Sequence, residues 1–303
     1  MALSFRPLNP HFGVDVSGVD LAGEVPDAMF AEIVAAYYRH SVLLFRGQNL
    51  VPAAQARLTR RFGKPKIETR KQFNLREHPE VSALGNIVDA DGRPLAFFNR
   101  LGESWHTDGV AACHVDAATL LYAVQVPRQG GDTMFASAAA AYETLPTALR
   151  AQAAKLRMRC SFHAHNDKIR EADPASHVAL TPEERAALPD VWHDVVQVHP
   201  VTGRTVLYLY DSALEYDGLP ERTAAPLMAQ LFTHATREGF TYRHRWSRGD
   251  LMVWDNHAML HSATAVGPYE KDRRLMHRSF AYTWPTARPL DNIDERNAIF
   301  RRA

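Results

Sequence analysis

The sequence is poor in cysteine and has no long hydrophobic run. Its 303 residues include only two cysteines, Cys113 and Cys160, which are too few for a disulfide framework or a cysteine-rich zinc site and fit a reducing compartment. No apolar run approaches the roughly 18 residues of a membrane-spanning helix. The N-terminus lacks a basic segment followed by an apolar core, so no secretory signal is visible. We therefore expect a cytoplasmic protein without a membrane span.

The sequence also lacks a charge excess and the common nucleotide-binding motifs. There are 35 Lys+Arg against 34 Asp+Glu, a formal net charge of +1, which gives no support for a nucleic-acid partner. Neither Gly-x-Gly-x-x-Gly, a phosphate-binding loop nor Gly-x-Ser-x-Gly occurs. Their absence removes the usual signatures of dinucleotide-binding proteins, phosphate-loop proteins and serine hydrolases.

Histidine, in contrast, is abundant. The chain has 15, roughly twice the number that average composition would give a chain of this length. Because histidine is the commonest metal ligand and proton-transfer group, the positions of these residues bear on function. His193 and His199 lie in a strand-like run and at its end, and we interpret them as packing or turn residues.

The pattern along the chain predicts a mainly β protein with flanking helices. Helical spacing of apolar residues occurs around 30–38 and over 52–62, which is followed by Gly63, a typical C-terminal cap. Further helices are expected at 137–156 and 220–238. Strand-like runs separated by turns are expected at 41–45, 118–126, 158–162, 195–198, 205–210, 240–246, 251–254 and 274–284. We infer an antiparallel β-sandwich core with helices packed outside.

The polar stretch at about 164–190 shows little hydrophobic periodicity. Its exception is Thr181-Pro182-Glu183-Glu184, which has the form of a capping box with proline at the first helical position. We expect this stretch to be a lid or an insertion.

The sharpest local motif is Trp105-His106-Thr107-Asp108-Gly109. Side chains two residues apart on an extended segment point the same way, so His106 and Asp108 can contact one ion from one side. Two histidines and one carboxylate that leave three coordination positions open form the metal site of non-heme Fe(II) oxygenases. A second histidine would have to come from elsewhere, and segment 249–261 runs strand, turn, then His261.

Two arginines share one face of the last strand-like run. Alternation places Arg274 and Arg278 on the side of Phe280 and Tyr282, whereas His277 lies on the other side. Cations on an apolar, aromatic face are expensive to desolvate unless an anion meets them. An anion-binding site and a pair of structural salt bridges are the two interpretations.

A rival metal triad consists of His163, His165 and Asp167, which share a face if their segment is extended. Three ligands from one flexible segment would form a loose site, so we rank it lower. Asp255 and Asn256 are expected to shape the turn before His261 rather than to bind a ligand.

A series of short motifs extends over most of the chain. They are Gly18-Val19-Asp20-Leu21, His40-Ser41-Val42-Leu43-Leu44-Phe45-Arg46-Gly47-Gln48, Arg61-Phe62-Gly63, Trp105-His106-Thr107-Asp108, Gly130-Gly131-Asp132-Thr133, His199-Pro200-Val201-Thr202-Gly203-Arg204, Gly249-Asp250, Trp254-Asp255-Asn256, His261 and Arg273-Arg274-Leu275-Met276-His277-Arg278. Any one of these motifs is weak. In this order, they resemble the TauD/TfdA family of Fe(II)- and 2-oxoglutarate-dependent dioxygenases, named for taurine and 2,4-dichlorophenoxyacetate dioxygenases.

The resemblance implies a fold and a set of ligands. It implies a double-stranded β-helix, or jelly roll, in a single dioxygenase domain over residues 1–303. Iron would be held by the catalytic residues His106, Asp108 and His261. Further, 2-oxoglutarate would chelate the metal through its 2-oxo acid end, while its distal carboxylate meets Arg274 and Thr133. Arg278 would bind a substrate anion or the C1 carboxylate of 2-oxoglutarate.

The resemblance also implies a reaction. O2 and 2-oxoglutarate would be cosubstrates, and hydroxylation of an aliphatic C–H bond in a small carboxylate or sulfonate substrate would release succinate and CO2. Related halogenases replace the carboxylate ligand with a small residue, so Asp108 favours hydroxylation. The alternatives are desaturation, cyclisation or epimerisation by the same iron chemistry, and a non-catalytic jelly-roll binding protein. A structural metal would ordinarily have a fourth protein ligand, which argues against the binding protein. Family members commonly associate, so a homo-oligomer is an open expectation.

Departures from the taurine enzymes concern the substrate. Gly102 stands where those enzymes typically have asparagine, and Gly109, Val110 and Ala111 replace bulky apolar residues after the metal aspartate. We therefore expect a substrate bulkier than taurine.

Two further assignments follow from the resemblance. His163, His165 and Asn166 align with a substrate-facing segment, and we expect them to contact substrate rather than metal. The long spacing between His261 and the arginines leaves Arg273 as an alternative partner for 2-oxoglutarate, although strand alternation favours its neighbour at position 274.

Overall fold

The fold is a mainly β sandwich with helices on its outside, as predicted. The computed structural model describes residues 2–68, 70–97, 100–110, 118–172, 179–186, 188–267 and 272–282. Cys113 and the expected end of the last strand at Trp284 lie outside these residues, whereas Cys160 is buried.

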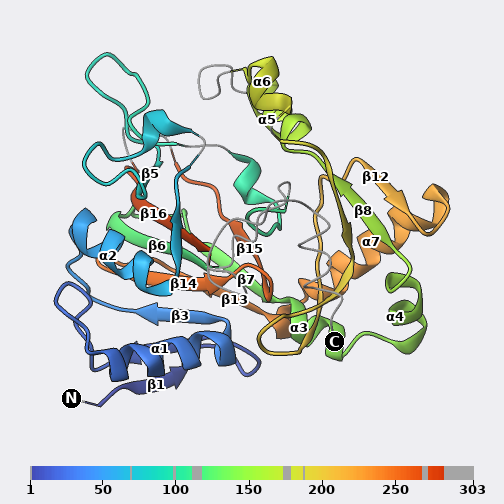
Figure 1. Cartoon of the computed structure of the whole chain (residues 1–303), viewed down its shortest axis with the longest axis horizontal. Coiled ribbons are helices and arrows are strands. Elements are labelled where there is room, and N and C mark those ends of the chain that lie inside the picture. The colour runs from blue at the N-terminus through green and yellow to red at the C-terminus, as the bar shows by residue number, and fades with distance from the viewer. Residues whose placement is uncertain are drawn as a thin grey trace.

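The larger sheet lies toward the left of Figure 1. Its order is β1-β2-β3-β14-β6-β16-β4, with β5 also pairing with β16, and all neighbours are antiparallel except β2 and β3. The strands are β1 (Ser4–Pro7), β2 (Val14–Ser17), β3 (Val42–Phe45), β4 (Lys64–Lys66), β5 (Ser82–Gly85), β6 (Ala118–Gln125), β14 (Leu251–Asp255) and β16 (Leu275–Tyr282). The central strands β3, β6 and β14 are apolar and almost wholly buried because both faces of the sheet are covered.

The second sheet has the order β13-β7-β15. Its strands are β13 (Thr241–His244), β7 (Thr133–Ser137) and β15 (Met259–Ala263). Phe135 of this sheet packs edge-on against Trp254 of the larger one, with ring centroids 5.3 Å apart, and Met252 and Met276 join the same buried cluster. This cluster is the core between the two sheets.

Smaller strand groups and the helices complete the fold. The strands are β8 (Arg157–Cys160), β9 (Val191–Asp194) and β12 (Glu215–Asp217) in one sheet, and β10 (Val196–Val198) and β11 (Thr205–Leu207) in another. The helices are α1 (Asp27–His40), α2 (Pro52–Phe62), α3 (Ala138–Glu143), α4 (Thr147–Ala153), α5 (Phe162–Ala172), α6 (Pro182–Ala186) and α7 (Glu221–Ala235), with 3-10 turns η1 (Lys71–Phe73), η2 (Arg100–Glu103) and η3 (Glu238–Phe240).

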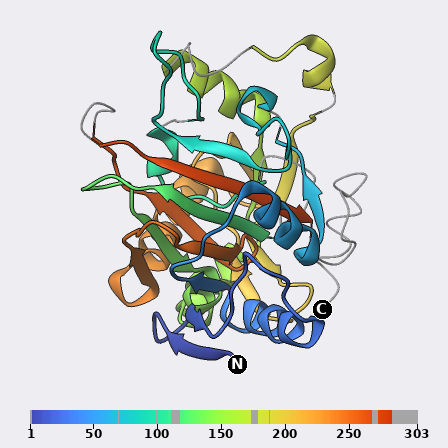
Figure 2. The same ribbon diagram turned by 90° about the vertical axis from the view of Figure 1, so that its left-hand side faces the viewer.

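Helix α2 covers the outer face of the larger sheet (Figure 2). Its buried Gln55 donates to the backbone oxygen of His277 and to the hydroxyl of Ser279 on β16, each over 3.1 Å. These bonds hold the face of β16 opposite to the one that carries Arg278. No helix in the described part of the chain is both long enough and apolar enough to cross a membrane.

The prediction of one continuous helix over 137–156 is wrong. The segment forms α3 and α4 instead, because Pro146 lies between them and its ring cannot continue a helix. Thr144 ends α3, and Pro146 precedes the first residue of α4.

The expectation that the polar stretch at 164–190 holds only one short helix is also wrong. Helix α6 begins at Pro182 as predicted, but α5 covers Phe162–Ala172 as well. Asp167 of α5 accepts two hydrogen bonds from Arg185 of α6, of 2.7 and 2.9 Å. One face of α5 lines the cavity, and two of the three residues there, His165 and Lys168, are polar, so the apolar pattern of the helix is weak. Residues 173–178 and 187 of this stretch lie outside the described residues.

Strands β7 and β15 were missed by the sequence pattern. Both are short, rich in alanine and serine, and nearly wholly buried, so neither shows an alternation of apolar and polar residues. Strand β15 carries His261, and the strand expected at 274–284 is β16 over Leu275–Tyr282.

Candidate active site

A cavity of about 510 Å³ opens beside the predicted metal ligands. Its walls come from both sheets, from the loop after β4, from α5, and from the segment around Tyr210. The lining includes His106, Asp108, Thr133, His261, Arg274 and Arg278. Six of the residues predicted from the sequence therefore meet in one cavity.

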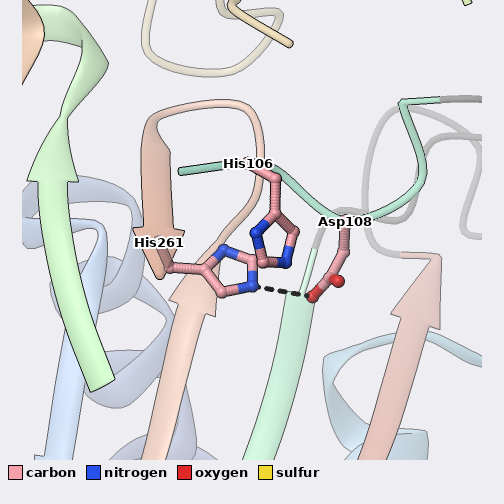
Figure 3. A group of neighbouring side chains, drawn as sticks. All are labelled: His106, Asp108 and His261. Carbon is pink, nitrogen blue, oxygen red and sulfur yellow. Dashed lines mark ion pairs between the residues drawn. The ribbon is translucent and has the colours of Figure 1, made fainter. Parts of the chain in front are cut away.

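The two histidines face each other across a single β-bridge (Figure 3). The backbone nitrogen of His106 donates to the oxygen of His261 over 2.9 Å, and the reverse bond is 2.8 Å. This pairing brings the two imidazole rings to a centroid distance of 4.2 Å. The bridge thus supplies the second histidine that the His106 motif needs.

Asp108 completes the group from the same extended segment as His106. Its Oδ2 accepts a hydrogen bond of 2.9 Å from the hydroxyl of Thr119, which is fully buried on β6. Burial would raise the pKa of Asp108, but the neighbouring His261, Arg278 and His106 and the Thr119 hydrogen bond outweigh it and lower the pKa. The side chain is therefore held as a carboxylate.

The donor atoms of these three residues fit a metal ion. They lie within 4.8 Å of one another, and His261 Nε2 is 3.6 Å from Asp108 Oδ2, too far for a hydrogen bond. Burial and the nearby His106 lower the pKa of His261 to about 3, although Asp108 opposes the shift, so the ring is in the neutral form that binds metals. The Nδ1 of His106 lies 2.8 Å from the backbone oxygen of Ser104, which fixes the proton there and leaves Nε2 with its lone pair.

A second group, His199, Asp255 and His257, has similar spacing but a different chemistry. His199 Nδ1 accepts hydrogen bonds from the backbone nitrogens of Val201 and Thr202, each over 3.1 Å. The proton of the neutral ring is therefore on Nε2, which donates to Asp255 over 2.8 Å. With one nitrogen protonated and the other already accepting, His199 offers no lone pair to an ion. The group braces the fold, in agreement with the turn and packing roles predicted for His199 and Asp255.

Asn256 has a larger role than the turn predicted for it. Its side chain donates to Thr119 over 2.8 Å, and its side-chain oxygen accepts from Trp254 Nε1 over 2.9 Å. Its backbone oxygen accepts from the hydroxyl of Thr107, which lies between the two metal-ligand candidates of the His106 motif. Asn256 thus links β14, β6 and the segment that carries Asp108.

Arg274 is buried against the glycine-rich turn before β7. Its Nε donates to the backbone oxygen of Gly131 over 3.3 Å. Burial, with the nearby charge of Arg278, lowers its pKa to about 10, although Asp132 opposes the shift. Thr133 lines the same part of the cavity, and its hydroxyl accepts a 3.0 Å hydrogen bond from Trp246. A buried arginine that lies next to a second positive charge is a favourable binding site for a ligand anion.

Arg278 of β16 and Arg274, the residue directly before that strand, both line the cavity, as expected from the sequence for two residues that share one side. Its Nη2 lies 2.8 Å from Oε1 of Glu68, a residue that follows β4. The structural salt bridge that was one of the two interpretations of the sequence is therefore present at Arg278. No carboxylate among the described residues forms a salt bridge with Arg274.

Only one of the three predicted substrate contacts on α5 lines the cavity. His165 does so together with Phe162 and Lys168, which lie three residues before and three residues after it on the same helix, whereas His163 and Asn166 are not part of the lining. The rival metal triad depended on an extended segment. In a helix, positions 163, 165 and 167 point in different directions and form no metal-binding group.

Several residues at the site were not found from the sequence. Thr119 was hidden in a strand-like run, and Glu68 and Arg70 in a charged segment that resembled a solvated loop. Gly102, Gly109 and Val110 do line the cavity, as their proposed effect on its size requires, whereas Ala111 lies outside the described residues.

Comparisons with known proteins show the family of the chain. The family described as "Taurine catabolism dioxygenase TauD, TfdA family" matches residues 4–280. An alpha-ketoglutarate-dependent 2,4-dichlorophenoxyacetate dioxygenase of Cupriavidus pinatubonensis is 34% identical over 272 residues, which are 86% of this chain and 92% of the relative. An alpha-ketoglutarate-dependent sulfate ester dioxygenase of Pseudomonas putida is 30% identical over 283 residues, covering 92% and 89%.

Solved structures lead to the same family. A taurine dioxygenase from Burkholderia xenovorans superposes with a TM-score of 0.73 at 29% identity, covering 99% of both chains. A second structure, of AAD-2 in complex with Mn(II) and N-oxalylglycine, gives a TM-score of 0.75 at 26% identity and covers 94% of this chain and all of that one. The jelly-roll fold predicted from the sequence is thereby confirmed. The chain belongs to the TauD/TfdA family and is a 2-oxoglutarate-dependent dioxygenase that uses O2.

Proposed function

We propose that this enzyme oxidises a C–H bond of a small anionic substrate at an Fe(II) ion held by His106, Asp108 and His261. One observation carries the proposal: two histidines and one carboxylate, supplied by two segments that are distant in the chain, converge on a cavity that two arginines also line. The three ligands share one side, which is the arrangement that leaves coordination positions open for cosubstrate and O2.

The protein residues would bind and orient the reactants. Arg274 is the partner we propose for the distal carboxylate of 2-oxoglutarate, with Thr133 as a hydrogen-bond donor beside it. Arg273 is exposed, so water can solvate its charge. Arg274 is buried and lines the cavity, so it is the better partner for a ligand anion. Thr119 and the Ser104 carbonyl would hold Asp108 and His106 in the orientation in which their free lone pairs face the metal.

When bound, iron would supply the redox chemistry that couples decarboxylation of 2-oxoglutarate to oxidation of the substrate. The chain's own contribution is to place the substrate C–H bond close to the metal and to keep water out. Apolar residues of the lining, such as Val110, Phe162 and Leu188, supply the walls for this purpose.

We propose a substrate with a carboxylate, sulfonate or sulfate group and a body larger than taurine. Relatives are named for a phenoxyacetate and for sulfate esters. Gly102, Gly109 and Val110 leave room next to Asp108, and Arg278 or its neighbours would bind the anionic group. We propose hydroxylation as the outcome of the reaction. We also propose that residues 1–303 form a single dioxygenase domain.

The test is turnover with a panel of aryloxyacetates, alkyl sulfate esters and sulfonates. Protein loaded with Fe(II) should release succinate from 2-oxoglutarate in step with substrate loss. Mass measurement of the product separates the outcomes: a gain of one oxygen atom identifies hydroxylation, and a loss of two hydrogens identifies desaturation.

Two variants show whether the triad carries this activity. Asp108→Ala should abolish succinate release and metal binding. His234→Ala changes a histidine outside the cavity lining and should leave both unchanged. Undiminished turnover in D108A would contradict the metal assignment.

A further inference from the structure

Glu68 occupies part of the anion-binding surface of Arg278. Its Oε1 lies 2.8 Å from Nη2 of the arginine, and the two side chains are only 14% and 17% exposed. Both residues line the cavity. A carboxylate of the protein thus already binds a cation that could serve a ligand.

The guanidinium of Arg278 is not saturated by this contact. Its Nε is buried and has no hydrogen-bond partner among the described residues. A guanidinium has five N–H donors and prefers a carboxylate that takes two of them at once, whereas Glu68 contacts it through one nitrogen. An incoming carboxylate or sulfonate can therefore make more bonds to Arg278 than Glu68 does.

Arg70 is a second cation near Glu68. Its guanidinium carbon is 4.2 Å from the centroid of the Phe97 ring, and it lines the same cavity. Burial lowers the pKa of Arg70 to about 10, the charge of Glu68 opposes the shift, and Arg278 adds to it. Glu68 therefore has two neighbouring cations, Arg278 and Arg70, and a Glu68 side chain that leaves Arg278 still has the charge of Arg70 nearby.

The backbone of Glu68 is anchored independently of its side chain. Asn74 donates to the backbone oxygen of Glu68 over 3.3 Å. A side-chain rotation can therefore release Arg278 without unfolding the segment after β4.

We propose that Glu68 is a displaceable internal ligand: it occupies the place of a carboxylate or sulfonate on Arg278, and a bound anion moves it toward Arg70. The inference rests on the proposed function, since it concerns the same cavity. It makes Glu68 a specificity-determining residue. Anions that accept hydrogen bonds from Arg278 through two oxygens displace Glu68. Uncharged groups, and groups that bind Arg278 more weakly than Glu68 does, leave it in place. The anion has two candidate sources, the C1 carboxylate of 2-oxoglutarate and the acidic group of the substrate.

The test measures binding without turnover. Calorimetry on Mn(II)-loaded full-length protein would compare wild type with Glu68→Gln, which keeps the shape and removes the charge. One arm titrates N-oxalylglycine, a mimic of 2-oxoglutarate. The other titrates phenoxyacetate into protein already saturated with N-oxalylglycine. Loss of the competing carboxylate should tighten binding in one arm by about tenfold, and that arm identifies the source of the anion.

The control is Glu103→Gln, the same change at another carboxylate of the cavity lining. Glu103 is exposed and has no ion pair with Arg278, so its effect measures the general benefit of removing a negative charge. Equal tightening by both variants would overturn the proposal, as would unchanged or weaker binding in both arms of E68Q.

A second variant covers the case in which E68Q fails to fold. Glu68→Asp keeps the charge but shortens the side chain by one methylene, so its contact with Arg278 lengthens. Binding should again tighten, by less than in E68Q, and an unchanged affinity in folded E68D would refute displacement. None of these measurements needs catalysis. Absence of turnover with normal Mn(II) binding would count against the proposed reaction and not against the role of Glu68.

Discussion

At the scale of single residues, the position of Arg274 depends on a glycine. Gly131 has a φ of +67°, and a Cβ there would lie 3.0 Å from Cδ and 3.1 Å from Nε of Arg274. A side chain at this position would therefore require the Arg274 side chain to shift by a few tenths of an ångström, and it would also strain the turn. The Gly130-Gly131-Asp132-Thr133 motif thus helps to position the side chain of an arginine that is more than 140 residues away in the chain.

We predict that Gly131→Ala weakens 2-oxoglutarate binding by about tenfold or more, because the ion pair with Arg274 loses its geometry. Gly203→Ala is the matched control, since Gly203 has the same φ of +67° but no atom within 4 Å of its would-be Cβ. Both variants should lose similar stability, and only G131A should raise the dissociation constant measured by calorimetry. Equal binding in the two variants would refute the steric argument.

A second residue-scale prediction concerns Thr119, which donates to Asp108 and accepts from Asn256. Thr119→Val keeps the shape but removes both bonds, and metal affinity should fall by about tenfold, as for other residues that orient metal ligands. Thr119→Ser restores the hydroxyl and should recover most of the affinity. Metal titration reports both results. Failure of serine to rescue would show that the methyl group, not the hydrogen bond, matters.

At the scale of elements, α5 turns a weak apolar pattern into one wall of the cavity. Phe162, His165 and Lys168 recur at helical spacing on its inner face. His165 Nδ1 is also 3.1 Å from the hydroxyl of Tyr210, another residue of the lining. Helix α5 thus contributes His165 and Lys168 to the cavity that Arg278 of β16 also lines.

We expect His165→Ala to raise the substrate KM several-fold, because it removes a cavity contact and frees Tyr210. His163→Ala, two positions away on the same helix, should change KM by less than about twofold, the range of ordinary substitutions away from a site. Initial-rate measurements at saturating 2-oxoglutarate distinguish the two. A larger effect of H163A would mean that α5 turns a different face to the substrate.

At the scale of the whole molecule, the site joins segments that are distant in the chain. His106 and Asp108 precede β6, His261 lies on β15, and Arg274 directly precedes β16. Ligands that bridge these segments bind only the folded state, so they must stabilise it.

We predict that Mn(II) with N-oxalylglycine at about 100 times the dissociation constant raises Tm by about 5 °C, since such binding adds about 2.7 kcal/mol. In Asp108→Ala the shift should nearly vanish, whereas in His234→Ala it should persist. Thermal unfolding followed by circular dichroism measures it. A full shift in D108A would place the ligands elsewhere.

The sequence was sufficient for several parts of this description. Alternation along the last strand put Arg274 and Arg278 on one face, because a pleated strand has a period of two whatever surrounds it. The spacing of His106 and Asp108 gave the local half of the candidate metal site for the same reason. Helix α6 was predicted because its capping residues lie within one turn of each other.

The rest required the tertiary structure, because it depends on residues that meet through folding rather than through spacing. The β-bridge between His106 and His261, the hydrogen bonds of Thr119 and Asn256 around Asp108, and the contact of Glu68 with Arg278 join positions 11 to 210 residues apart. Sequence alone determined which chemical groups the chain has and which local faces they share. Only the packing of two sheets and α5 decided which of fifteen histidines and many charges are buried together, because burial and neighbouring charge are properties of the assembled core.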